Sequence, residues 1–202
     1  MPGKLTAKGR ATRSRIVVGA AAVLRERGIA SATLDDIMAR TSTSKSQLFH
    51  YFPTGKDELL VAVAQFEADQ VLEDQQPYLG RLDSWESWEQ WRDAVVRRYE
   101  AQGDQCPLGS LFLQIGRSTP GARAIVVELL RRWQESLAAG IRALQAAGEL
   151  PADVDADTRA AALLAGIQGG VSILLSTGRS THLRAALDQG IADLRRAGGA
   201  TA

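Results

Sequence analysis

Residues 44–60 read Ser-Lys-Ser-Gln-Leu-Phe-His-Tyr-Phe-Pro-Thr-Gly-Lys-Asp-Glu-Leu-Leu, and this stretch decides the fold. Ser44 followed by Gln47 has the spacing of a capping box, which predicts a short helix that starts at Lys45 and ends before the proline. A second short helix comes before it, with Thr33 in position to cap its first turn. Two short helices joined by a few polar residues predict a helix-turn-helix.

Upstream of this stretch, an apolar stripe at helical spacing predicts one more helix, which Gly28 should terminate. The stripe consists of Ile16, Val17, Ala20, Val23 and Leu24. Three small helices therefore fill residues 1–55, which we expect to form one domain. Residues 56–202 are expected to form a second, also helical.

The second domain is expected to hold about six longer helices and no strands, so the fold class is all-α with about nine helices. The first of these helices is expected to start at Lys56, and the second to start between Asp83 and Glu86 and to end at Gly103. A short third helix should contain Leu108, Leu111, Phe112 and Ile115, and the fourth should run from Pro120 to Gly148. The last two helices should cover about 157–176 and 181–197. A Pro/Asp-containing loop should precede the last two helices.

Charge is distributed unevenly along the chain, although its formal net value is only +1. Residues 1–56 carry ten Lys or Arg against three acidic residues, so the remainder of the chain is net acidic. A basic head on an acidic body predicts a polyanionic partner for the head, or else only a solvated basic face. Four of the basic residues are expected to form a mobile N-terminal arm: Lys8, Arg10, Arg13 and Arg15.

The single cysteine, Cys106, excludes an internal disulfide framework and favours a reducing, cytoplasmic location. The first residues lack the apolar core of a signal peptide. The longest uncharged run, residues 160–178, contains a glutamine, two serines, a threonine and four glycines, so we expect a buried or subunit-facing helix and no membrane partner. No metal-ligand spacing or phosphate loop occurs, and no cofactor is expected.

The stretch quoted above resembles the TetR/AcrR family, whose signature is a recognition helix followed by an aromatic segment and then Lys-acid-acid-Leu. The resemblance covers residues 12–60, while the rest of the chain agrees only in helix number and length. The Thr54-Gly55 pair before Lys56 and the segment Cys-Pro-Leu-Gly-Ser-Leu at 106–111 look most like the LmrA/YxaF branch.

The resemblance implies a repressor of palindromic operator DNA that is released by a small-molecule inducer. Lys45 and Gln47 lie in the first turn of the recognition helix, where lysine donates to guanine and glutamine pairs with adenine. The full set of residues expected at the DNA is Thr33, Thr43, Ser44, Lys45, Ser46, Gln47, His50, Tyr51 and Lys56. Leu48 and Phe52 are instead expected in the core of the head.

Two positions depart from the family pattern. Phe49 takes the place of the usual tyrosine and lacks its hydroxyl, and Ser46 replaces a common glycine. Both changes keep open the alternative of a helical adaptor that binds another protein and no DNA.

The body is rich in aromatic residues at helical spacing, and the resemblance implies an apolar, aromatic-lined inducer pocket there. The expected lining residues are Trp85, Trp88, Trp91, Tyr99, Cys106, Leu108, Phe112 and Trp133. The alternative is that these aromatic residues only fill the core. Cys106, at an expected helix start, also raises the alternative of a repressor that senses electrophiles or oxidants through its thiol.

The last two helices are expected to form a homodimer as a four-helix bundle, with one large monomeric core as the alternative. The small residues are Ala161, Ala162, Ala165, Gly166, Gly169 and Gly170, and the apolar ones are Leu163, Leu164, Ile167, Val171, Leu174, Leu175, Leu183, Leu187, Ile191 and Leu194. The chain has two histidines and no catalytic triad or metal-ligand pattern, so an enzyme is not expected. In the cell we expect it in the cytoplasm, associated with the nucleoid.

Overall fold

Helices account for all regular secondary structure in the described part of the chain, which covers residues 6–103, 106–107, 109 and 115–199 of a computed structural model. The α-helices are α1 (Ala7–Arg27), α2 (Leu34–Thr41), α3 (Lys45–Tyr51), α4 (Lys56–Glu73), α5 (Trp85–Gln102), α7 (Pro120–Ala146), α8 (Ala156–Thr177) and α9 (Thr181–Gly199). Two 3₁₀ turns, η1 (Tyr78–Gly80) and η3 (Ile115–Arg117), complete the described elements.

The all-α expectation is confirmed: eight α-helices lie within the described ranges. The short helix expected through Leu108 and Phe112 falls largely outside the described residues. The chain divides into two compact units, Met1–Gln70 with Ser110–Val127 and Val71–Gly109 with Glu128–Ala202. We call the first the head unit and the second the body unit.

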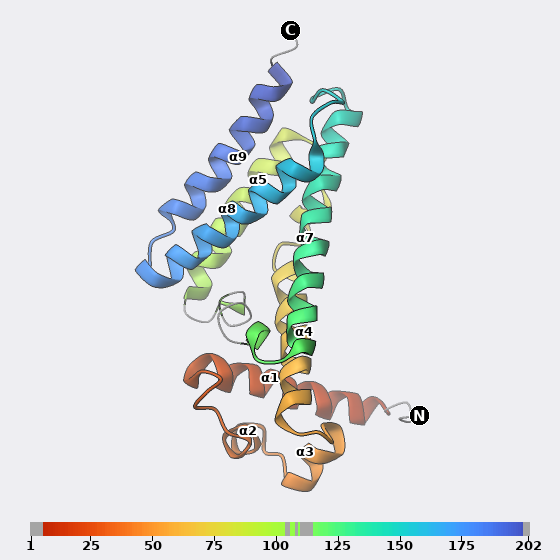
Figure 1. The fold of residues 1–202 in the computed structure, drawn as a ribbon, viewed down its shortest axis with the longest axis vertical. Coiled ribbons are helices and arrows are strands. Elements are labelled where there is room, and N and C mark those ends of the chain that lie inside the picture. Colours follow the sequence, from red (N-terminus) through yellow and green to blue (C-terminus); the bar gives the residue numbers. More distant parts are fainter. Residues whose placement is uncertain (1–5, 104–105, 108, 110–114, 200–202) are drawn as a thin grey trace. The chain divides into compact units, whose positions relative to one another are not determined.

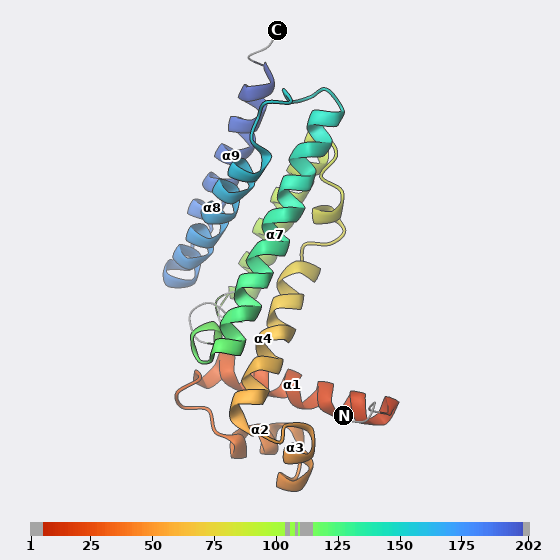
Figure 2. The ribbon, with the colours of Figure 1, turned by 45° about the vertical axis from the view of Figure 1, so that its right-hand side comes forward.

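In the head unit, α1, α2 and α3 form the helix-turn-helix domain (Figures 1 and 2). The expected helix limits are confirmed at three places. The N–H of Gly28 closes α1 on the carbonyl of Leu24, Thr33 and Asp36 form a complete capping box, and the Ser44 hydroxyl accepts from the N–H of Gln47.

One expectation about the head unit was wrong. The four basic residues expected in a mobile arm lie on α1, which begins at Ala7 because the Thr6 side chain caps it by accepting from the N–H of Gly9. The expected start of α5 between Asp83 and Glu86 is confirmed, since this helix begins at Trp85. Ser84 is its N-cap and forms a capping box with Ser87.

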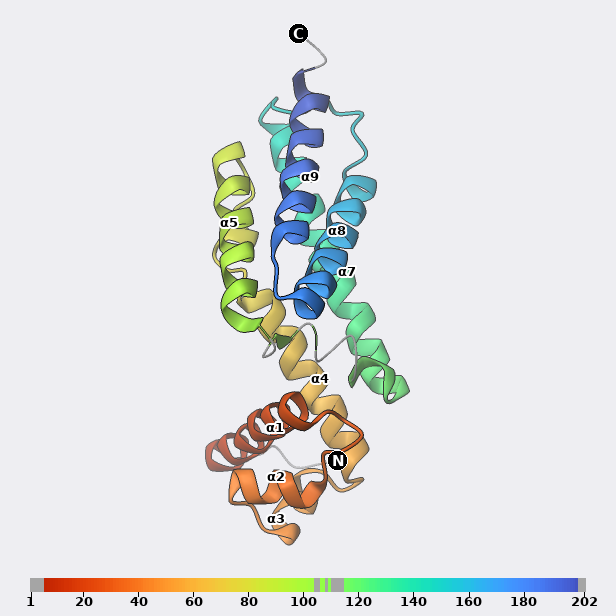
Figure 3. The same ribbon diagram turned by 90° about the vertical axis from the view of Figure 1, so that its left-hand side faces the viewer.

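In the body unit, α8 and α9 pack side by side as an antiparallel hairpin (Figure 3). Gly170 lets them approach closely, since a Cβ there would lie 2.5 Å from the Leu183 Cα. Among the described helices α8 alone has the length and apolarity of a membrane span, and 39% of its most apolar window is buried. A packed core helix has the same composition.

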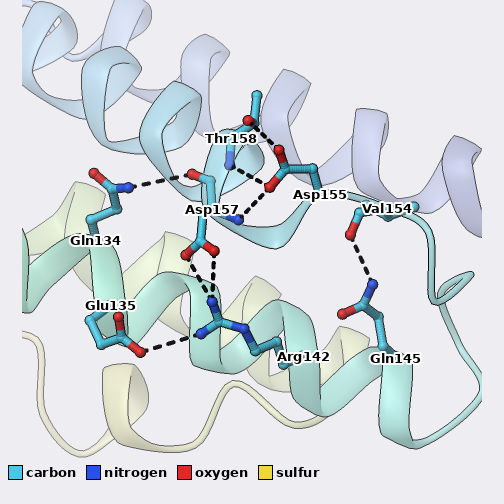
Figure 4. Close-up of polar contacts among 8 residues, drawn as sticks. All are labelled: Gln134, Glu135, Arg142, Gln145, Val154, Asp155, Asp157 and Thr158. Carbon is cyan, nitrogen blue, oxygen red and sulfur yellow. Dashed lines mark hydrogen bonds and ion pairs between the residues drawn. The ribbon is translucent and has the colours of Figure 1, made fainter.

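Polar contacts join α7 to the start of α8 (Figure 4). The Arg142 guanidinium donates to both carboxylate oxygens of Asp157 at 2.8 Å. The Gln145 amide donates to the carbonyls of Pro151 and Val154, each at 2.9 Å. Asp155 caps α8 and has a lowered pKa, because its carboxylate accepts from the Thr158 hydroxyl and backbone. These contacts fix the direction in which the α8–α9 hairpin leaves α7.

Candidate nucleic-acid interface and effector site

The turn between α2 and α3 is built around a residue in the left-handed region. Ser42 has φ 48° and ψ 48°, and its N–H donates to carbonyls in the last turn of α2. Thr41 is buried, and its hydroxyl bridges the Ile37 carbonyl at 2.7 Å and the Thr43 hydroxyl at 2.9 Å. This internal bonding fixes the angle at which α3 leaves α2.

Helix α3 presents its first turn to solvent. Ser44, Lys45 and Ser46 are exposed and Gln47 is half-buried, while Leu48 on the opposite face is fully buried. The core positions predicted for Leu48 and Phe52 are confirmed, since both have 0% exposure. An exposed helix N-terminus offers free N–H groups and a positive dipole end to an anion. The turn therefore combines one cationic side chain, three short polar ones and backbone donors.

Thr33 and Thr43 lie in more constrained places. The Thr33 side chain is engaged in the capping box, and its hydrogen bonds are the main cause of the lowered pKa of Asp36. Thr43 is buried, and its hydroxyl hydrogen-bonds within the turn. A phosphate contact from Thr43 would require its hydroxyl to leave these bonds.

The end of α3 carries His50, exposed, and Tyr51, half-buried, whose rings meet edge to face at 4.8 Å. Lys56, at the start of α4, donates from its ammonium to the carbonyls of Ile29 and Ala32 at 3.1 and 2.7 Å. A third ammonium N–H is left for a phosphate. Lys56 thereby joins α4 to the loop between α1 and α2.

The basic residues of α1 have structural contacts as well as charge. The Arg13 guanidinium lies 5.0 Å from the centre of the Phe52 ring, and Arg15 donates to the carbonyl of Thr41. Near the other end of α1, Arg25 donates to both oxygens of the fully buried Glu67 carboxylate at 2.8 and 3.1 Å. α1 therefore holds both the recognition helix and α4 in place.

The aromatic residues of α5 divide into two groups. Trp88 and Trp91 are fully buried and pack edge to face at 5.6 Å. Trp85 lies apart from them, with its indole N–H donating to Glu149 at 2.9 Å and Arg195 stacked 5.2 Å from its ring. The structure therefore does not bring Trp85 together with the other expected lining residues.

A narrow cleft in the body unit has a volume of about 240 Å³ including its open mouth. It contains one expected lining residue, Tyr99, together with Val71, Asp74, Gln75, Val95, Arg98, Gln102 and Pro107. At its edge Asp74 accepts from Arg98 and Gln102. Burial raises the pKa of Tyr99 well above its ordinary value, with smaller contributions from Cys106 and Asp74, so the phenol is neutral.

Other expected lining residues lie in the core or outside the described residues. Cys106 is buried with 2% exposure, and Trp133 is fully buried on α7. Leu108 and Phe112 fall outside the described residues.

Sequence reasoning missed two glutamines in the body unit. Gln75 is buried, accepts from the indole of Trp91 at 3.1 Å and donates to the carbonyl of Val71 at 2.9 Å. Gln168 places its amide nitrogen in the interior with no partner, as Trp88 and Trp133 do with their indole nitrogens. A buried unpaired donor costs about 1–3 kcal/mol. The available signal was the polar Gln168 within an apolar run.

Comparison with known proteins agrees with this geometry. Residues 16–63 match the model of the bacterial regulatory proteins of the tetR family, and residues 83–189 match the model of the tetracyclin repressor-like C-terminal domain. The transcriptional regulator AcuR of Cereibacter sphaeroides is 28% identical over 155 residues, which cover 73% of this chain and 69% of that protein.

Two further relatives extend the comparison. An uncharacterised helix-turn-helix regulator of Mycobacterium tuberculosis is 24% identical over 52% of this chain and 53% of its own length. The crystal structure of a TetR transcriptional regulator from Chloroflexus aurantiacus superposes with a TM-score of 0.76 at 25% identity, covering 93% of this chain and 96% of that one. The two proteins share the fold.

Proposed function

Since this chain belongs to the TetR family of bacterial regulatory proteins, we propose that it represses transcription from a palindromic operator and is released by a small lipophilic or aromatic effector. Regulators of this family bind operator DNA through the helix-turn-helix, bind small molecules through the C-terminal domain and act as dimers. They are generally soluble cytoplasmic DNA-binding proteins, not enzymes. The observation that carries the proposal is the exposed first turn of α3, Ser44 to Gln47, in a basic head.

Residues 1–55 are the proposed DNA-binding domain and residues 56–202 the effector and dimer domain, with the nucleoid as the site of action. Lys45 and Gln47 read bases, because they lie in the turn that enters the major groove. The remaining proposed contacts, mostly to phosphate, are Thr33, Thr43, Ser44, Ser46, His50, Tyr51 and Lys56. His50 lies at the end of α3, and the Lys56 ammonium lies beside the loop before α2. Both residues suit this role because each carries nitrogen donors for a phosphate.

The proposed dimer face is the side of α8 and α9 that is not used within the hairpin. Ala162, Ala165 and Gly169 are exposed along α8, and Ile173 continues this row with 37% exposure. A row of small residues lets a second helix approach closely, and exposed apolar area favours its burial. Two copies related by a twofold axis would present two α3 helices to a palindrome.

The proposed effector contacts are the aromatic and apolar residues of the body, Trp88, Trp91, Tyr99, Cys106, Leu108, Phe112 and Trp133, with Trp85 at its periphery. Effector binding would stabilise a body conformation in which the two recognition helices are wrongly spaced for DNA. The extent of release is limited by the difference in effector affinity between the DNA-binding conformation and the released conformation. Thr54-Gly55 and the 106–111 segment support placement near the LmrA/YxaF branch.

Selection of bound sequences from a random DNA pool by the full-length protein tests this function. We expect an enriched palindrome, since a twofold dimer reads two equal half-sites. No enriched sequence from a well-folded dimer would contradict the proposal and favour the adaptor alternative, for which Phe49 is an exposed apolar side chain.

A thiol-sensing repressor is a second candidate, because the single cysteine of the chain, Cys106, is a reduced thiol in the body unit. Mild peroxide followed by mass spectrometry separates it from effector release. Oxidation of Cys106 together with loss of DNA binding would support the thiol sensor. Loss of DNA binding with Cys106 still reduced would eliminate it.

A further inference from the structure

Among the residues that the structure describes, three buried N–H donors in the body unit have no acceptor, and each comes from a different helix. They are the indole N–H of Trp88 on α5, the indole N–H of Trp133 on α7 and an amide N–H of Gln168 on α8. Buried polar groups are nearly always hydrogen-bonded in folded proteins, so each exception needs an explanation. A missing acceptor supplied by a bound molecule is one such explanation.

Trp88 is explained by packing. The position of a Cβ on Gly140 would lie 3.1 Å from the Cζ2 atom of Trp88, on the indole edge that carries the N–H, and 2.5 Å from the Cβ of Leu82. The indole therefore fits closely against the backbone of α7, with no room for an added group. Dense packing at this place therefore explains why the N–H of Trp88 has no acceptor.

Trp133 and Gln168 are arranged differently. Helices α7 and α8 run in opposite directions (Figures 1 and 2). Gln134, in the middle of α7, and Arg142, near its end, both contact Asp157 at the start of α8 (Figure 4). Side chains on a helix lean towards its N-terminus. Trp133 therefore leans along α7 away from this junction, and Gln168, about three turns into α8, leans back towards it. Along the antiparallel pair the two side chains therefore lean towards each other.

No charged side chain is buried among the described residues of the body unit. Its buried polar groups include the Gln75 amide, which is occupied by Val71 and Trp91, and the neutral hydroxyl of Tyr99. A carboxylate brought here would lose its hydration with no buried cation to replace it, and an ammonium would find donors instead of acceptors. A neutral oxygen acceptor avoids both the loss of charge hydration and the lack of acceptors.

We infer that Trp133 and Gln168 are effector-binding donors, and that the effector of this protein is a neutral molecule with a carbonyl-type oxygen on an apolar body. This inference rests on the proposed effector function and names its ligand class. Binding selects an open form of the bundle in which the ligand oxygen accepts from the two N–H groups. The buried apolar side chains of the body unit supply the apolar contact area.

Calorimetric titration of the full-length protein with four bicyclic probes of one skeleton tests this inference. The probes are 1-tetralone (neutral ketone), tetralin (no oxygen), tetralin-1-carboxylate (anion) and 1-aminotetralin (cation). We expect the ketone to bind at least about tenfold more tightly than the other three. Tighter binding of the anion or cation, or no binding of the ketone, would overturn the inference.

Three variants identify the donors. Trp133→Phe and Gln168→Leu each remove an N–H while keeping a similar apolar volume, so both should reduce the preference for ketone over tetralin by about tenfold and leave tetralin binding unchanged. Trp88→Phe is the matched control and should retain the full preference, because the indole of Trp88 packs closely against α7 at Gly140. An unchanged preference in both Trp133→Phe and Gln168→Leu would overturn the assignment.

The titration contains no DNA, so its outcome is separable from the proposed repressor function. A ketone preference without an enriched operator would remove only the repressor proposal. An enriched operator without a ketone preference would remove only the ligand class.

Discussion

At the residue scale, the ion pair between Arg25 and Glu67 places a charged carboxylate in the interior of the head unit. The Glu67 carboxylate is fully buried, and the Arg25 side chain is 17% exposed. Removing one partner of a buried pair leaves the other charge without compensation. We expect Glu67→Gln to lower the free energy of unfolding by about 3 kcal/mol, measured by urea denaturation.

Glu128→Gln is the matched control, since Glu128 also pairs with an arginine, Arg131, at 2.8 Å but in an exposed position. Solvent screens such pairs, so the control should leave stability unchanged within error. Equal effects of the two substitutions would show that burial of Glu67 contributes nothing to stability.

The buried phenol of Tyr99 predicts a pH dependence at the alkaline end. Burial raises its pKa, so above the ordinary value of 10.0 the unfolded chain releases a proton that the folded chain retains. The free energy of unfolding should therefore fall as the pH rises past that value. Denaturation from about pH 9 to about pH 11 should show a shallower fall for Tyr99→Phe than for the parent protein. Parallel curves would contradict the burial of this hydroxyl.

At the element scale, the α8–α9 hairpin depends on the absence of a side chain at Gly170. A Cβ there would lie 2.5 Å from the backbone of Leu183, whereas a Cβ on Gly199, at the end of α9, would meet nothing within 4 Å. We expect Gly170→Ala to lower the free energy of unfolding by about 1–3 kcal/mol. Gly199→Ala should not lower it, because alanine favours helix. Thermal denaturation compares the two, and equal losses would refute close packing at Gly170.

Element boundaries were predictable from sequence where a cap or stop residue acts locally. Thr33, Ser44, Gly28 and Gly103 each lie where the sequence placed a helix end, because their hydrogen bonds join residues at most four positions apart. The start of α1 was missed because the basic residues after Thr6 were interpreted as a mobile arm, so Thr6 was not considered as an N-cap.

The site was less predictable than the helix ends because side-chain partners come from distant parts of the sequence. Trp85 shares a helix with Trp88, yet its indole binds Glu149, 64 residues away. Likewise Lys56 donates to carbonyls 24 and 27 residues earlier. Helical spacing identifies which residues share a helix, and the tertiary fold alone decides which of them face the interior.

At the scale of the whole molecule, the proposed dimerisation through α8 and α9 predicts a sharp effect from one substitution. Ala165→Arg places a long charged side chain in the exposed row of small residues on α8. Because that charge would be desolvated at the interface, we expect the variant to sediment as a monomer and to bind operator DNA weakly. Ala146→Arg, at the exposed end of α7, is the control and should remain dimeric. A dimeric Ala165→Arg would move the interface elsewhere.

The central claim is that the first turn of α3 reads an operator, and the most direct test is the affinity of the full-length protein for its selected site. Lys45→Ala and Gln47→Ala should each weaken specific binding by about 1–3 kcal/mol per half-site contact, while Gln90→Ala, at an exposed position of α5, is the matched control and should have no effect. Specific affinity unchanged in both Lys45→Ala and Gln47→Ala, with folded dimers, would contradict the account.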